Sequence, residues 1–287
     1  MATLVDSHVH LDRYPDEEVA AMVSRAATAG VRRLLTIGVD LATSRAALDL
    51  AARHPSILAA VGVHPTRLRE AWRAQVTPQQ LDAEGPPSLM RADRMGRQAE
   101  QAPPLPVGWG GAELLDGLWG LLERGPAAIG EVGLDAGAPD LDEQRRFLAG
   151  CFALAEERAL PLVLHVVGDT ATHEQALAIA RKYPGLRTVA HYFVGGPELA
   201  RGYLDAGCWI SVGRPVTRPT DLAVRAAVPT IPLDRLLLET DTYPLPGRTT
   251  EPRDVATVCA AVAELTGQTY EEIAAATTAN FARFIGA

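Results

Sequence analysis

The sequence contains few cysteines, almost no lysine and no long apolar run. Its three cysteines, Cys151, Cys208 and Cys259, are widely spaced and odd in number, which argues against a disulfide framework or a thiolate metal site and indicates a reducing compartment. No apolar stretch approaches the roughly 18 residues that span a bilayer. The N-terminal segment lacks the pattern of a secretory signal. We therefore expect a cytoplasmic protein without membrane contact.

Length and composition indicate one large folded domain. The 287 residues are 47% hydrophobic and 22% charged, which excludes a mainly disordered or fibrous chain. The formal net charge is −8, so sequence-independent attraction to long polyanions is disfavoured, although a local basic pocket is compatible with this balance.

Short apolar segments alternate with amphipathic helical segments along the chain. Eight strands separated by helices, at a length near the usual ~250 residues, predict an α/β fold: a single-domain (β/α)8 TIM barrel over residues 1–287. An open doubly wound sheet is the alternative, but it normally carries a glycine-rich turn after its first strand, where this chain has His-Val-His-Leu-Asp. The expected strands are 3–10, 33–39, 57–63, 127–133, 161–167, 187–193, 208–213 and 235–241. The main expected helices are 17–29, 43–53, 141–158, 172–182, 196–206, 219–227, 252–266 and 270–285.

An extended loop insertion at residues 66–125 interrupts this rhythm after the third strand. It is far longer than a usual crossover and holds three of the four tryptophans. Amphipathic helix is expected at 67–75 and 112–124. A lid and a contact that forms a homo-oligomer are two hypotheses for this insertion, and a tolerated surface excursion is an equally weighted alternative.

The first expected strand carries a pair of imidazoles. Asp6, His8 and His10 stand at alternate positions, so in a regular strand all three side chains point the same way, which is inward in a barrel. Two imidazoles stacked near the carboxyl end of a strand can bind one metal ion from the same side. We therefore interpret His8 and His10 as metal ligands.

Polar side chains recur where other apolar strands end. Glu131, His165, His191 and Asp241 close the expected fourth, fifth, sixth and eighth strands. A buried carboxylate such as Glu131 needs a cation or several donors. Because the carboxyl ends of barrel strands meet at the face where enzymes of this fold place their chemistry, these residues are expected to form one site with His8 and His10.

The ligand types favour a pair of divalent cations. Imidazoles and carboxylates without thiolate suit Zn, Mn, Fe or Co, are less suited to Mg, and disfavour Ca; of Zn, Mn and Mg, we favour Zn or Mn. Six ligands exceed the three protein ligands of a usual catalytic zinc site, but they suit two metals bridged by one carboxylate. The single lysine, Lys182, lies on an expected helix, so Glu131 is the available bridge. Asp241 would orient the attacking water and accept its proton.

Three further residues are candidates for substrate binding. His64 ends the third expected strand, whereas Arg214 and Arg248 lie in loops after the seventh and eighth strands. The arginines would hold an anionic substrate. His173, at the start of an expected helix, is interpreted as structural.

Several sequence blocks together resemble the TatD family, metal-dependent hydrolases of the amidohydrolase superfamily. The resemblance covers nearly the whole chain outside 66–125. Its blocks are Asp-Ser-His-Val-His-Leu-Asp at 6–12, Val-Gly-Val-His-Pro at 61–65, Ile-Gly-Glu-Val-Gly-Leu-Asp at 129–135, Ala-His at 190–191 and Leu-Glu-Thr-Asp at 238–241. The resemblance implies a barrel in which His8, His10 and Asp241 hold one metal, His165 and His191 hold the other, and Glu131 bridges them.

The same resemblance implies that the protein is a phosphodiesterase, and more specifically a 3′–5′ DNA exonuclease. The expected substrate is therefore an anionic small molecule or the end of a nucleic acid. Val167 stands where the family commonly has an arginine. A hydrolase of a small ester, lactone or amide is therefore an alternative, and a non-catalytic scaffold that retains metal is a second one.

Overall fold

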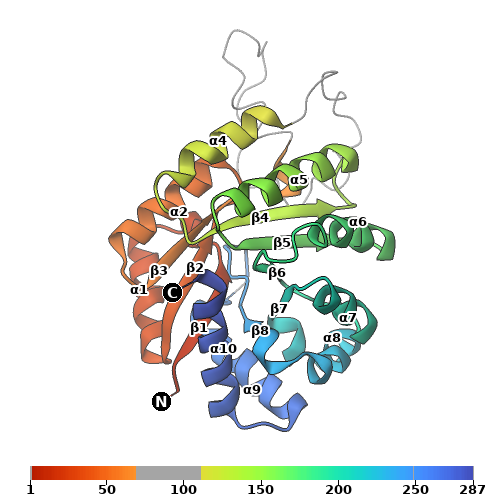
Figure 1. The fold of residues 1–287 in the computed structure, drawn as a ribbon. Coiled ribbons are helices and arrows are strands. Elements are labelled where there is room, and N and C mark those ends of the chain that lie inside the picture. The colour runs from red at the N-terminus through yellow and green to blue at the C-terminus, as the bar shows by residue number, and fades with distance from the viewer. Residues whose placement is uncertain (1, 69–110, 248, 287) are drawn as a thin grey trace.

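Eight parallel strands form one sheet whose spatial order follows the sequence (Figure 1). The computed structural model describes residues 2–68, 111–247 and 249–286. The strands curl into a nearly closed barrel, which confirms the predicted (β/α)8 fold. They are β1 (Leu4–Val9), β2 (Val31–Ile37), β3 (Ile57–Val61), β4 (Ala128–Asp135), β5 (Leu162–Val167), β6 (Thr188–Ala190), β7 (Trp209–Val212) and β8 (Leu236–Leu238).

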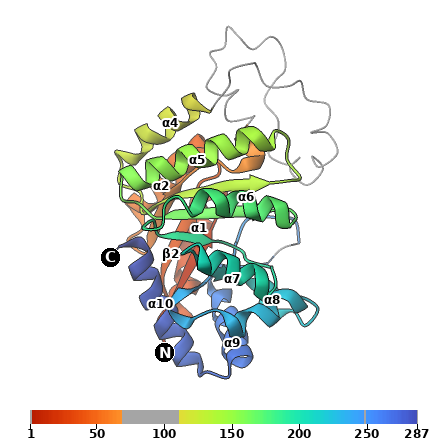
Figure 2. The ribbon, with the colours of Figure 1, turned by 45° about the vertical axis from the view of Figure 1, so that its right-hand side comes forward.

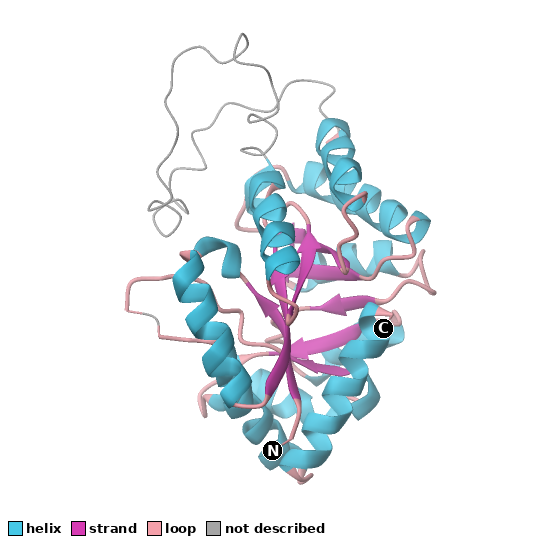
Figure 3. Cartoon of the chain, turned by 90° about the vertical axis from the view of Figure 1, so that its left-hand side faces the viewer, coloured by secondary structure: helices cyan, strands magenta, loops and turns pink. Residues whose placement is uncertain are grey.

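Helices surround the barrel and connect successive strands (Figures 2 and 3). Their order and type agree with the sequence prediction, including the expected helix at 112–124. The expected helix at 67–75 falls largely outside the described residues. The helices are α1 (Asp16–Thr28), α2 (Leu41–Arg53), α4 (Ala112–Leu122), α5 (Leu141–Glu157), α6 (Thr170–Ala180), α7 (Pro197–Asp205), α8 (Leu222–Ala227), α9 (Val255–Thr266) and α10 (Tyr270–Ile285). Among the described helices, none has the length and apolar character needed to cross a bilayer.

Apolar side chains fill the inside of the barrel below the site. Each strand contributes to one buried cluster, and Phe281 and Phe284 of α10 complete it. A larger cluster lies between the outer face of the strands and the helices. Apolar burial is the main stabilising contribution to folding, and these two clusters supply it. The polar groups lie outside them, at the carboxyl ends of the strands. The inner members from the strands are Val5, Leu35, Ile37, Ala60, Ala128, Val163, Val189, Trp209 and Leu237.

The segment that follows β8 makes the closing contact of the barrel. Thr242 forms a parallel bridge with Val9, and its carbonyl accepts a hydrogen bond from the His10 amide at 2.8 Å. The Asp241 amide donates to the His8 carbonyl at 3.0 Å. The strand expected at 235–241 is therefore shorter in the structure, where β8 ends at Leu238. The residues that follow pair with β1, which brings Asp241 beside both histidines.

Two strands depart from regular pairing where they carry site residues. The register of β1 against β2 shifts between Asp6 and Val9, and that of β4 against β5 shifts between Ile129 and Val132. Such irregularities re-aim side chains. They also correct the expectation that Asp6 shares one face with the two histidines, because the Asp6 carboxylate instead accepts hydrogen bonds from Thr240 N at 2.9 Å and Thr240 Oγ1 at 2.6 Å.

Glycine allows β4 to approach its neighbours closely at the level of the site. A Cβ atom on Gly133 would lie 1.7 Å from the His165 carbonyl oxygen, and one on Gly62 would lie 2.7 Å from the Glu131 nitrogen. No side chain fits at either distance. Because Gly62 and Gly133 have no side chain, the ends of β3 and β5 can lie against β4, the strand that carries Glu131.

Candidate metal centre

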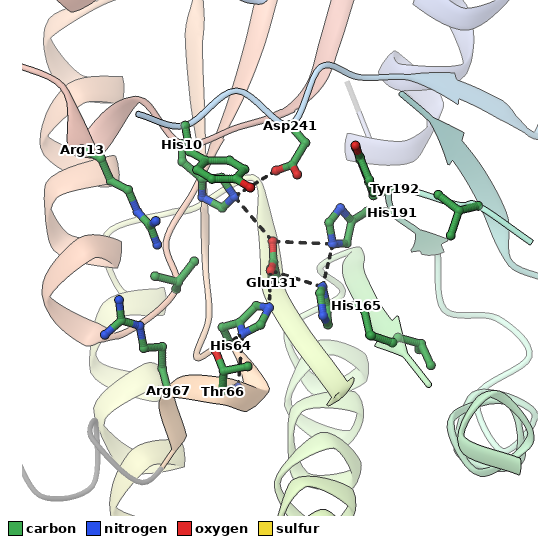
Figure 4. Close-up of a pocket in the computed structure, with 15 residues that line it drawn as sticks. His10, Arg13, His64, Thr66, Arg67, Glu131, His165, His191, Tyr192 and Asp241 are labelled. Carbon is green, nitrogen blue, oxygen red and sulfur yellow. Dashed lines mark hydrogen bonds and ion pairs between the residues drawn. The ribbon is translucent and has the colours of Figure 1, made fainter. Parts of the chain in front are cut away.

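Five of the six expected ligand residues, His10, Glu131, His165, His191 and Asp241, line one cavity at the carboxyl ends of the strands (Figure 4). The sixth, His8, is fully buried against Glu131. Glu131 lies on β4, His8 on β1 and His165 on β5. His10 and His191 directly follow β1 and β6, and Asp241 follows β8 after Glu239 and Thr240. The side chains of His8, Glu131 and His191 are at most 5% exposed. The separate parts of the sequence pattern therefore form a single buried cluster.

Glu131 occupies the middle of the cluster, and its two oxygens face different imidazoles. Oε2 lies 2.8 Å from His8 Nε2 and 3.7 Å from both His10 Nε2 and His191 Nε2. Oε1 lies 2.8 Å from His64 Nε2 and 3.4 Å from His165 Nδ1. Oε2 therefore faces His8, His10 and His191, whereas Oε1 faces His64 and His165.

The first half contains His8, His10 and Asp241. Nε2 of His10 lies 3.3 Å from Nε2 of His8 and 3.3 Å from Oδ1 of Asp241. One atom from each of these three residues lies within 4.8 Å of the others. The Nδ1 atom of His10 lies 2.9 Å from the Ile37 carbonyl, which orients the ring so that Nε2 faces the centre.

The second half contains His165 and His191. Nδ1 of His165 lies 3.0 Å from Nε2 of His191. The His191 ring stacks on His8, with 4.0 Å between ring centroids, which connects the two halves. His64 also approaches here, and its ligand atom forms a compact group with those of Glu131 and His165.

The protonation of His64 follows from its contacts. The Thr66 amide donates to His64 Nδ1 at 3.2 Å, so the ring proton of neutral His64 resides on Nε2 and points at Glu131 Oε1. Burial and the neighbouring His165 lower the pKa of His64 to about 4. In this tautomer His64 acts as a donor to Glu131.

The charge of Glu131 is maintained by its neighbours. Burial by itself would raise the pKa of this carboxyl, but His191, His64 and His8 hold it well below its usual range. Burial likewise would lower the pKa of His191, yet the charges of Glu131 and Glu239 raise it to about 9. An anionic carboxylate is thus surrounded by imidazoles, one of which is protonated at neutral pH.

The arrangement of buried donor atoms fits divalent cations. Oε2 of Glu131, Nε2 of His165 and Nδ1 of His8 are buried without a hydrogen-bond partner. Oε2 lies 2.8 Å from Nε2 of His8 and 3.7 Å from Nε2 of both His10 and His191. A buried carboxylate oxygen that faces several imidazole nitrogens is typical of a metal site.

Two acidic residues beside the cluster escaped the sequence analysis. Glu239 is completely buried; its Oε1 accepts from the Tyr192 amide at 2.7 Å and lies 3.4 Å from His191 Nδ1. Asp135 Oδ2 lies 3.9 Å from His165 Nε2. Carboxylates beside a ligating imidazole fix its orientation. Glu239 could have been found from the sequence, because it is a charged residue two positions before Asp241 that directly follows an apolar segment.

The cavity above the cluster has a volume of about 440 Å³ and two unlike sides. Arg13 and Arg67 lie on one side, beyond His10 and His64, and Tyr192 lies on the opposite side (Figure 4). Val167 and Val194 also line the cavity and are 49% and 54% exposed. The sequence analysis had not singled out either arginine, because a helical turn after a strand gives no signal of its own.

Two of the three residues expected to bind substrate are described by the structure. Arg214 donates to Thr250 Oγ1 and is not among the described residues that line this cavity. Arg248 lies outside the described residues. His64 does line the cavity.

Known proteins resemble this chain in both sequence and architecture. A family model described as TatD related DNase matches residues 5–286. The uncharacterized metal-dependent hydrolase YjjV of Escherichia coli K12 is 30% identical over 95% of this chain and 93% of its own length. A protein of Klebsiella pneumoniae named 3′-5′ ssDNA/RNA exonuclease TatD is 29% identical over 92% of this chain and 90% of its own length.

Solved structures agree with these matches. The crystal structure of YJJV, a TatD homologue from Escherichia coli K12, superposes with a TM-score of 0.76 at 26% identity and covers 99% of this chain and 98% of the other. A TatD family hydrolase from Entamoeba histolytica has a TM-score of 0.73 at 18% identity over 99% and 98% of the two chains, a likeness of fold alone. The chain belongs to the TatD family of metal-dependent hydrolases.

Proposed function

We propose that this hydrolase uses two divalent metal ions to hydrolyse phosphoesters, with a 3′–5′ exonuclease acting on nucleic-acid ends as its specific form. The observation that carries the proposal is the position of Glu131, whose two oxygens face separate groups of imidazoles. His8, His10 and Asp241 would hold one ion, and His165 and His191 the other, with Glu131 shared between them. The donor set favours Zn or Mn over Mg.

When bound, such a metal pair lowers the pKa of water and polarises the phosphoryl group. Asp241 would orient the attacking water and accept its proton, because its carboxylate lies at the edge of the cluster and lines the cavity. Burial would raise the pKa of Asp241, but its hydrogen bond to His10 and the charges of His10 and His8 hold it far below the usual range. The carboxylate is therefore ionised at neutral pH. The new bond joins the water oxygen to phosphorus, the bond from phosphorus to the leaving oxygen breaks, and the proton taken up by Asp241 would pass to that oxygen to give the alcohol.

Arg13 and Arg67 support an anionic substrate. Both line the cavity on the same side of the cluster (Figure 4), and guanidinium groups bind phosphate and carboxylate oxygens through paired hydrogen bonds. The exonuclease name of the Klebsiella relative supports nucleic acid as one such substrate.

A hydrolase of small esters, lactones or amides is the second candidate. Val167 is 49% exposed in the cavity, so this side of the site offers apolar contact where a basic residue would hold a phosphate. A small, largely uncharged acyl group suits that side better than a nucleic-acid strand.

A substrate panel with metal-loaded protein distinguishes the candidates. We would assay bis-(p-nitrophenyl) phosphate, single-stranded DNA labelled separately at its two ends, and a set of lactones and aryl esters, each with Mn or Zn. Turnover of the phosphodiester with stepwise loss from the 3′ end supports the proposal. Turnover of lactones or esters alone supports the second candidate, and full metal occupancy without any turnover would indicate a non-catalytic scaffold.

A further inference from the structure

A buried hydrogen-bond network joins β1 to the segment that follows β8. It consists of Asp6, Thr240 and Thr242, all of which are 0% exposed. Oδ2 of Asp6 accepts a hydrogen bond from Thr240 Oγ1 at 2.6 Å, and Thr240 Oγ1 lies 2.7 Å from Thr242 Oγ1. None of these three residues lines the metal cavity. The network is therefore close to the metal cluster without being part of its surface.

The hydrogen bonds of this network end at the Asp6 carboxylate. Its Oδ1 atom accepts from the Thr240 amide at 2.9 Å and from the His8 amide at 3.3 Å, and its Oδ2 atom accepts from the Thr240 hydroxyl. A hydroxyl group has a single proton, so the Thr240 oxygen that donates to Asp6 accepts in turn from the Thr242 hydroxyl. Asp6 thus holds Thr240 directly and Thr242 through Thr240.

Asp241 lies between the two threonines, and its carboxylate faces the metal cluster. Oδ1 of Asp241 lies 3.3 Å from His10 Nε2, and the residue lines the metal cavity. Its backbone φ angle is +50°, in the left-handed region that residues other than glycine rarely adopt. Such a conformation persists only where the surrounding structure over-determines it. The contacts of the neighbouring residues must therefore maintain the turn at Asp241.

Both the backbone and the side chains of β1 supply these contacts. The Asp241 amide donates to the His8 carbonyl at 3.0 Å, and the Thr242 carbonyl accepts from the His10 amide at 2.8 Å. Asp6 adds an anchor at the side chain on either side of Asp241. Together these anchors restrict rotation of the two peptide planes that flank Asp241, and they thereby fix the direction of its carboxylate. A displacement of roughly 1 Å in a catalytic group can cost about 100-fold in rate.

We propose that Asp6 is a positioning residue for Asp241: through Thr240 and Thr242 it holds the left-handed turn that directs the Asp241 carboxylate toward His8 and His10. The inference rests on the proposed role of Asp241 as a metal ligand and proton acceptor. Asp6 itself touches neither the substrate nor the attacking water, because it lies outside the cavity. Its contribution to the reaction is the orientation of another carboxylate.

Two substitutions of Thr240 and one matched control test the network. Thr240→Val keeps the shape of the side chain but removes the hydroxyl that donates to Asp6, whereas Thr240→Ser retains a hydroxyl. Ser7→Ala is the control, because the buried Ser7 hydroxyl, also on β1, donates to the Leu238 carbonyl at 2.9 Å and lies 3.0 Å from Ser211 Oγ. Thr240→Val and Ser7→Ala should each lower the Tm by about 2–6 °C, since each removes buried hydrogen bonds.

Only Thr240→Val should impair the metal site. We expect metal binding about 10–100-fold weaker than in wild type, the usual effect of losing a partner that orients a ligand. At saturating metal, kcat should fall by about 100-fold with KM unchanged, because the loss affects the reacting groups and not substrate binding. Chelator competition measures metal affinity, and the kinetics use whichever ester the wild type hydrolyses. Thr240→Ser and Ser7→Ala should retain wild-type values; equal losses in Thr240→Val and Ser7→Ala, or no rescue by serine, would overturn the inference.

A double-mutant cycle shows whether the network acts through Asp241. In an Asp241→Ala background, Thr240→Val should cause no further loss of Mn affinity, because residues that act as one unit have non-additive effects. Additive losses would contradict the positioning role.

Asp6→Asn provides a second variant if Thr240→Val does not fold. The asparagine has the same shape and retains an acceptor for the Thr240 amide, but it presents an N–H group to the Thr240 hydroxyl. It should weaken Mn binding about 10-fold, and unchanged binding would overturn the inference. If no ester is hydrolysed but Mn binding weakens as expected, the hydrolytic proposal fails and the positioning role of Asp6 stands.

Discussion

Glu131 turns its Oε2 atom toward Nε2 of His8 at 2.8 Å, although the two residues lie on strands that are not neighbours in the barrel. Register shifts in both strands accompany this approach. Removal of a carboxylate that faces imidazoles on both sides should therefore affect both halves of the site.

Glu131→Ala should remove most bound metal and most activity while the barrel stays folded. Without the shared carboxylate, metal content should fall below one ion per chain and kcat by at least about 100-fold, because both ions would lose a ligand. Metal analysis by mass spectrometry together with circular dichroism measures both effects. Glu264→Ala, on the exposed side of α9, is the control. Normal metal content in Glu131→Ala would contradict the bridging role.

Glu239→Gln should weaken metal binding without removing a ligand. Glu239 is buried beside Nδ1 of His191, and loss of such a carboxylate typically costs about 10–100-fold in metal affinity. The Tyr192 amide retains an acceptor in the glutamine side chain, so the fold should persist. Metal dissociation constants from chelator competition provide the measurement, and an unchanged constant would exclude an orienting role for Glu239.

Metal binding should release protons at neutral pH. In the metal-free protein, the surrounding carboxylates raise the pKa of His191 to about 9, so this imidazole is protonated at pH 7 and must lose its proton to coordinate. Affinity should therefore rise as pH increases from about 6.5 toward 9 and level off above it. Calorimetry in buffers of different ionisation enthalpy counts the released protons. A count of zero at pH 7 would contradict His191 as a ligand.

Arg13→Gln and Arg67→Gln should weaken the binding of anionic substrates. Each should raise KM for bis-(p-nitrophenyl) phosphate by about 3–10-fold with little change in kcat, because an arginine at the rim holds the substrate without touching the reacting bond. Arg53→Gln, which removes only an exposed ion pair with Asp16, is the matched control. Added salt should reduce the difference in KM between the wild type and the two variants. If both variants had the wild-type KM, these arginines would not bind the substrate.

Gly133→Ala should destabilise the barrel at the site. Its new Cβ would lie 1.7 Å from the His165 carbonyl oxygen, so β4 and β5 must separate, at a cost of about 3 kcal/mol. Gly120→Ala in α4 meets nothing within 4 Å and should instead stabilise by about 0.5–1 kcal/mol. Denaturant unfolding monitored by fluorescence compares the two. Equal stability of both variants would show that β4 does not require this close approach.

Several features of the site and fold followed from local sequence. Alternation of apolar strands and amphipathic helices is a short-range pattern, so the barrel and most element positions could be predicted from it. His8, Glu131 and Asp241 stood out because charged or imidazole side chains at the ends of apolar strands are costly to bury alone. The Gly-Glu pair at 130–131 and the His-Val-His segment carried that signal without reference to any distant residue.

Other features were decided only by the tertiary structure. Pairing of Thr242 with Val9 closes the barrel and brings Asp241 beside the histidines. The register shift in β1 separates Asp6, which hydrogen-bonds Thr240, from the cluster. Arg13 and Arg67 lie on one side of the cavity, and Glu239 lies beside His191. Both arrangements bring together segments that are far apart in the chain. A residue's own neighbours specify its strand or helix, but a contact across the barrel depends on register and closure, which the packing of the whole molecule determines.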